Sequence, residues 1–106
     1  MQDITCPEGA RKFGRERLPD RRGNESFQFE HAGFVYTATI SCFPDSNRLA
    51  EIFIDHERPN SQIAEHAADS AVLASLLLQH GVSVASIRHS ISGPLSVALA
   101  LAEGST

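Results

Sequence analysis

The stretch FQFEHAGFVYTATIS, residues 27–41, decides the fold of this chain. Both of its halves alternate apolar and polar residues with the period of two that is typical of a half-buried strand. Between them, His31-Ala32-Gly33 supplies a turn with a glycine that tolerates positive φ. The stretch therefore predicts two strands joined by a hairpin, with one face expected to be buried: Phe34, Tyr36, Ala38 and Ile40.

The residues that follow predict a third strand and then a long helix. Residues 44–47 (PDSN) favour a turn, and residues 49–54 (LAEIFI) favour a strand, so three consecutive strands form an antiparallel meander. Asn60 or Ser61 can cap the helix, which is expected to stop at Gly81. Apolar residues recur at helical spacing: Ile63, Ala67, Ala71, Ala74 and Leu78. The stripe expected to be buried is rich in alanine: Ala64, Ala67, Ala68, Ala71 and Ala74.

Two shorter helices are expected after Gly81. Val82-Ser83 resembles a staple residue and a cap before a helix over residues 84–91, and Pro94 suits the first turn of a last helix over 95–102. The predicted fold class is α+β: a three-stranded antiparallel meander followed by a long helix and two short helices (β-β-β-α-α-α), with the long helix covering one face of the sheet.

Length and charge divide the chain into an arm and a body. A chain of 106 residues with 42% hydrophobic residues has room for one core. Residues 1–25 mix Pro, Gly and charge, so we expect a disordered basic N-terminal arm before a domain at residues 26–106. The arm holds most of the basic residues although the net charge is −4: Arg11, Lys12, Arg15, Arg17, Arg21 and Arg22. Such an arm can contact nucleic acid, lie solvated, or lie on its own acidic domain.

The sequence has no apolar run near the roughly 18 residues that a membrane span needs, and its N-terminus does not resemble a signal peptide. We therefore expect a cytoplasmic protein with no membrane partner. The two cysteines, Cys6 and Cys42, are expected to be free thiols.

No pattern predicts a metal, a cofactor or a catalytic residue. The five histidines lack helical metal-site spacing, and Cys42, His56 and His89 are the one trio to test for convergence. Cys42 has no adjacent general base, and we interpret Glu51, Asp55 and Glu57 as the exposed charged face of an edge strand.

One group is a candidate anion or ligand site. Arg88 and His89 precede Ser92-Gly93-Pro94, where a helix start exposes backbone N–H groups beside a basic side chain. The alternative is structural: Gly93 permits the turn, Pro94 starts the helix, and Arg88 pairs with an acid of the body.

Residues 34–101 resemble the TSCPD domain, a module known at the C-terminal end of adenosylcobalamin-dependent ribonucleotide reductases and as free-standing small bacterial proteins. The resemblance rests on the order of the parts: the strand at 34–39 (FVYTAT), the strand at 49–54, and the long helix ending in residues 77–81 (LLQHG). Where the family has Ser-Cys-Pro-Asp, this chain has Ser92-Gly93-Pro94-Leu95 and lacks the cysteine and the aspartate. It is also too short to be a reductase by itself.

Three hypotheses of function follow. The first is a non-catalytic accessory or interaction domain, related to ribonucleotide reductase, that binds a protein partner or itself as a homodimer. The second is a regulatory domain that binds a nucleotide or phosphate at Arg88, His89, Ser92 and Gly93. The third is a nucleic-acid tether that uses the basic arm.

Overall fold

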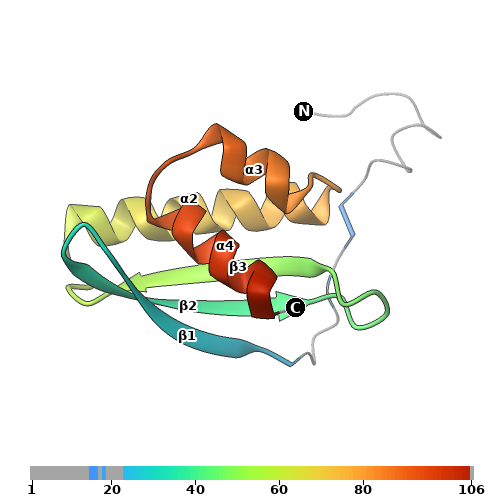
Figure 1. Ribbon diagram of the computed structural model, residues 1–106, viewed down its shortest axis with the longest axis horizontal. Coiled ribbons are helices and arrows are strands. Elements are labelled where there is room, and N and C mark those ends of the chain that lie inside the picture. The colour runs from blue at the N-terminus through green and yellow to red at the C-terminus, as the bar shows by residue number, and fades with distance from the viewer. Residues whose placement is uncertain (1–14, 17, 19–22, 106) are drawn as a thin grey trace.

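The computed structural model describes residues 15, 16, 18 and 23–105 and has the predicted α+β fold (Figure 1). Its elements, in chain order, are β1 (Glu25–His31), β2 (Phe34–Cys42), β3 (Leu49–His56), α2 (Gln62–Gln79), α3 (Val84–Ser90) and α4 (Pro94–Ser105). The three strands form an antiparallel sheet in the order β1-β2-β3, so both β1 and β3 are edge strands. The predicted order of elements is confirmed.

The hairpin between β1 and β2 is closed by a two-residue turn. His31 is paired with Phe34, and both turn residues have positive φ, 54° at Ala32 and 85° at Gly33. Two consecutive positive φ values match the twist of the flanking strands, which is the favoured geometry for a two-residue hairpin. This turn sets the register in which Tyr36 is paired with Phe29.

The three helices lie on one face of the sheet, and the core lies between the two layers (Figure 1). Alternate strand residues point toward the helices, among them Tyr36, Ala38 and Ile40, as the pattern predicts. Helical residues complete this core: Ala67, Ala71, Ala74, Leu78, Ile87, Leu95, Ala98, Leu99 and Ala102.

Helix α2 is capped by Ser61, whose hydroxyl accepts a hydrogen bond from the Ala64 N–H. It ends at Gln79, just before Gly81, whose φ of 92° favours glycine. Of the alanines expected to be buried, Ala64, Ala67, Ala71 and Ala74 are buried and Ala68 is exposed. Small side chains on the inward side let the helix axis lie close to the sheet. The predicted cap and stop are both confirmed.

Side chains of α2 cover part of the outer edge of β3. The Ile52 N–H donates to the Ser75 hydroxyl at 2.9 Å, and that hydroxyl donates back to the Ile52 carbonyl at 2.9 Å. The Gln79 amide donates to the Ala50 carbonyl at 3.0 Å. We call the row of α2 residues that faces the β3 edge the α2/β3 seam; it runs from Ala64 to Gln79.

The predicted exposure of Glu51 is wrong. Asp55 and Glu57 are exposed as expected, but Glu51 is buried, with 9% of its surface exposed. It is paired with Ser41 next to a β-bulge at Ser41/Cys42, and Ser41 is buried as well. A bulge changes which way side chains point, and the period-two pattern does not reveal it.

Most of the predicted arm lies outside the described residues, and the predicted domain boundary at residue 26 lies one residue inside β1. In the described part of the chain, no helix is both long enough and apolar enough to cross a membrane.

Candidate functional site

The predicted anion site is divided between two elements. Arg88 and His89 lie in the last turn of α3, whereas Ser92 and Gly93 lie in the link before α4. Arg88 Nη1 forms an ion pair with Glu103 Oε1 at 2.7 Å, and both side chains are about half exposed to solvent. This ion pair links α3 to α4. It agrees with the structural alternative, in which Arg88 pairs with an acid of the body.

Of the six basic residues assigned to nucleic-acid contact, the structure describes Arg15. Its Nε donates to the Gln79 side-chain oxygen at 2.5 Å, and the next residue, Glu16, donates its N–H to the Gln79 carbonyl at 2.7 Å. Glu16 also pairs with Arg48 at 2.8 Å. The other five lie outside the described residues: Arg11, Lys12, Arg17, Arg21 and Arg22.

The trio of Cys42, His56 and His89 does not converge. Cys42 is paired with Leu49 and His56 with Tyr36, so the two residues lie at opposite ends of the β2-β3 ladder. Among residues 15, 16, 18 and 23–105, no group of three or more His, Cys, Asp or Glu side chains is placed to hold a metal ion.

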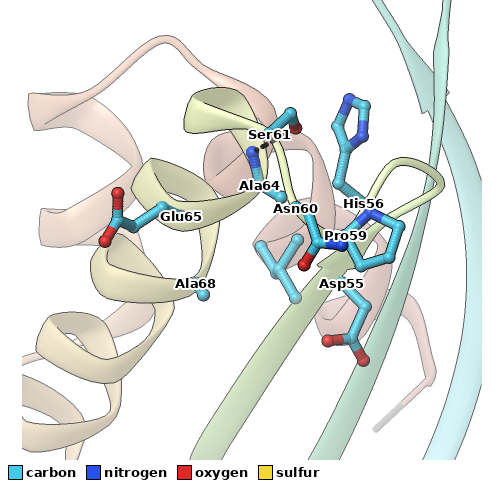
Figure 2. Close-up of a pocket in the computed structure, with 9 residues that line it drawn as sticks. Asp55, His56, Pro59, Asn60, Ser61, Ala64, Glu65 and Ala68 are labelled. Carbon is cyan, nitrogen blue, oxygen red and sulfur yellow. Dashed lines mark hydrogen bonds between the residues drawn. The ribbon is translucent and has the colours of Figure 1, made fainter.

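The larger of two described cavities, about 400 Å³, opens at one end of the α2/β3 seam (Figure 2). Its walls are the end of β3, the 59–61 loop and the first two turns of α2. The lining residues are Ile54, Asp55, His56, Pro59, Asn60, Ser61, Ala64, Glu65 and Ala68. Asp55 and Glu65 make it acidic, and none of the described lining residues is Lys or Arg. The sequence does not predict this cavity, because the cavity forms between segments that are separated along the chain.

His56 lines this cavity, but its ring points to the opposite side of β3 from Asp55 (Figure 2). The ring contacts Phe34 and Tyr36, each at a centroid distance of 4.9 Å. Nδ1 accepts the Arg58 N–H at 2.9 Å, which leaves the proton of the neutral ring on Nε2. Nε2 is buried with no partner among the described residues, so a water molecule is the simplest acceptor for it.

Cys42 lines a second cavity of about 310 Å³ at the other end of the sheet, beside Glu25, Phe43 and Pro44. Partial burial raises the pKa of the Cys42 thiol above its ordinary value of 9.0, and the nearby Glu25 carboxylate raises it further. A raised pKa keeps the thiol protonated near neutral pH. Cys42 is therefore poorly suited to act as a nucleophile.

We expect iodoacetamide to label Cys42 more slowly in the folded Cys6→Ser variant at pH 8 than in the same chain unfolded in urea. Steric shielding alone would also slow labelling, so Glu25→Gln is the matched control. Removing the carboxylate lowers the pKa and should speed labelling of the folded protein. An unchanged labelling rate in Glu25→Gln would contradict Glu25 as a cause of the raised pKa.

Because the pKa of the Cys42 thiol is raised in the folded protein, Cys42 contributes stability that is lost as the pH rises above about 9.

Helix α2 carries large apolar residues on its outer side. Ile63, Leu73 and Leu77 are 47%, 61% and 44% exposed, although the inner side of the same helix is mostly alanine. Together with His66 and Ser70, they recur at alternating spacings of three and four, the pattern of a coiled-coil seam. We call these five residues the outer stripe. Sequence reasoning missed it because inner and outer residues are both apolar, although the spacing itself is visible in the sequence.

No family model, curated protein or solved structure matches this chain in the comparisons made.

Proposed function

We propose that this chain is an interaction domain that binds another protein through the outer stripe of α2, and that its occupant is a second copy of the same chain. The observation that carries the proposal is the exposure of Ile63, Leu73 and Leu77 along one side of a helix whose other side forms the core. Leu73 and Leu77 lie four residues apart, and Ile63 lies beyond His66 and Ser70 on the same side of the helix. Exposed apolar side chains grouped on one side of a helix are characteristic of interaction sites.

The stripe is complementary to itself when two copies pack antiparallel. Ile63 lies seven residues before Ser70 and Leu77 lies seven after it. A two-fold axis at Ser70 therefore brings Ile63 of one copy against Leu77 of the second copy, and the reverse, over about 21 Å of helix. Ser70 is small and half-buried, so it allows close approach at the axis. Antiparallel packing also sets the two helix dipoles in opposite directions.

The resemblance to the TSCPD domain extends this proposal to an accessory role related to ribonucleotide reductase. This extension rests on the resemblance alone, which was drawn from the order of the strands and helices. A nucleotide- or phosphate-binding role at Arg88, His89, Ser92 and Gly93 is the alternative, and the pairing of Arg88 with Glu103 favours the interaction role over it. A nucleic-acid tether is supported less, because Arg15 of the arm already bonds Gln79.

The test is sedimentation of the purified protein over concentrations from micromolar to millimolar. We expect a monomer–dimer equilibrium, and we expect Leu77→Glu to weaken dimerisation at least tenfold, because it places a carboxylate against Ile63 of the second copy. Leu101→Glu is the matched control, since Leu101 on α4 is also 44% exposed and lies outside the stripe. A wild-type monomer at all concentrations, or equal weakening by both variants, would reject the outer stripe as the dimer interface.

A further inference from the structure

The two edges of the sheet differ in what covers them. At the β3 edge, side chains of α2 bond the Ile52 N–H and C=O and the Ala50 C=O. β1 lies at the other edge, and no further strand pairs with it among residues 15, 16, 18 and 23–105 (Figure 1). β1 also has no Pro, no Lys and no β-bulge, which are features that keep an edge strand from pairing with another chain. The described structure therefore leaves the edge of β1 open to a further strand.

The hairpin register shows which backbone groups point outward from β1. His31 and Phe34 close a two-residue hairpin, so these two residues exchange hydrogen bonds. Bonded and non-bonded pairs alternate along an antiparallel ladder, and every second residue of β1 therefore turns its N–H and C=O away from β2. These residues are Ser26, Gln28 and Glu30, and all of them are exposed. Each offers one donor and one acceptor to a further strand.

The sequence of β1 is complementary to itself when two copies run antiparallel. Gln28 is the middle residue of this seven-residue strand, so a two-fold axis at Gln28 pairs the whole strand with its copy. Ser26 of one copy then faces Glu30 of the second copy, and the outward backbone groups of both residues find partners. Glu25 faces His31, whose ring N–H can donate to a carboxylate. No two carboxylates face each other in this register.

Aromatic side chains favour the same register on the helix-covered face of the sheet. Phe27 of one copy lies opposite Phe29 of the second copy, in a non-hydrogen-bonded pair whose side chains are close together. Within one copy the centroids of these two rings are 6.3 Å apart, and Phe27 is partly buried. Aromatic pairs across neighbouring strands stabilise an antiparallel ladder. The second copy therefore covers the exposed part of Phe27 with another aromatic ring.

From these observations we propose that β1 pairs antiparallel with β1 of a second copy about a two-fold axis at Gln28, which joins the two sheets into one continuous sheet. The contact goes beyond the proposed function because it uses another surface: the outer stripe lies on α2, which packs on β3 at the opposite edge. Copies joined by their outer stripes keep their β1 edges, so the β1 contact links such dimers into a larger assembly. Two seven-residue strands form a small contact, and this assembly therefore forms at the upper end of the concentration range.

Disulfide trapping tests the register in a chain with Cys6→Ser and Cys42→Ser. Gln28→Cys places a thiol at the axis, where hydrogen-bonded residues have Cα atoms about 5.5 Å apart, within disulfide range. Ser26→Cys and Glu30→Cys are the matched controls, because each lies about 13 Å along the strand from the same residue of the second copy. On non-reducing electrophoresis we expect Gln28→Cys to form dimers at least fivefold faster than either control alone. An equal mixture of the two controls should recover most of that rate, since positions 26 and 30 face each other.

The outcomes separate this contact from the outer stripe. Equal rates for the three variants, or a mixture no faster than its components, would overturn the pairing of β1. The same ratios of rates are expected with Leu77→Glu added, because that substitution changes the outer stripe and leaves β1 intact. Loss of the ratios in that variant would show that β1 is not a separate contact. Ratios that persist while sedimentation shows no dimer dependent on Leu77 would reject the outer stripe and keep the β1 contact.

A charge placed at the axis gives a second test of the register. With Gln28→Glu in both members of the mixture, two carboxylates face each other, so the disulfide between positions 26 and 30 should form more slowly at low salt. Thr37→Glu is the matched control, since Thr37 is paired with Gln28 and lies one strand further from the axis. We expect Gln28→Glu to slow the reaction at least threefold more than Thr37→Glu does. Equal slowing by the two substitutions, or none by Gln28→Glu, would overturn the axis at Gln28.

Discussion

Replacing Leu78 by alanine is expected to lower the free energy of unfolding by about 3 kcal/mol, within the range of about 2–5 kcal/mol seen for buried leucines. Leu78 is 2% exposed and packs in the core between α2 and the sheet. The alanines beside it cannot move inward to fill the space, because α2 already lies close to β3. Urea unfolding followed by circular dichroism measures the change.

Leu77→Ala is the matched control for this prediction. It is the same substitution one residue earlier on the same helix, but Leu77 is 44% exposed on the outer stripe. We expect a loss below about 1 kcal/mol for the monomer, because surface substitutions away from packed features change stability little. Similar losses for the two variants would mean that the inner and outer sides of α2 are assigned wrongly.

The second large effect is expected at Ser75. Ser75→Ala removes at once the acceptor for the Ile52 N–H and the donor to the Ile52 carbonyl, both within a buried contact. Leaving buried backbone groups unpaired costs about 1–3 kcal/mol per group, so we expect a loss of about 2 kcal/mol or more. Thermal and urea unfolding at neutral pH would both report it.

Ser70→Ala is the control for Ser75. Ser70 lies on the same helix, but its hydroxyl donates to the Ala67 carbonyl of its own helix. Alanine has the higher helix propensity, so this substitution should be neutral or slightly stabilising. If Ser75→Ala were equally neutral, the bond between α2 and the edge of β3 would contribute nothing measurable to stability.

The two predictions have one structural basis. Helix α2 stabilises the domain through close packing of its inner side and through side-chain bonds to the edge of β3, while its outer stripe contributes little to the monomer. Substitutions on the outer stripe therefore test the interaction without unfolding the protein.

The amino-acid sequence by itself determined the elements and their order. The hairpin at His31-Ala32-Gly33, the cap at Ser61 and the stop before Gly81 are all local features, in which a few neighbouring residues set the backbone conformation. The buried face of β2 followed from its period-two pattern for the same reason.

Only the tertiary structure decided which surfaces carry the candidate sites. Ser75 and Ile52 are separated by 23 residues in the chain, and the Arg15 contact with Gln79 joins residues separated by 64. Periodicity also could not separate the inner and outer sides of α2, because alanine and leucine occur on several of its sides. Burial of Glu51 and the cavity beside Asp55 likewise depend on how distant segments pack, and local patterns do not contain that information.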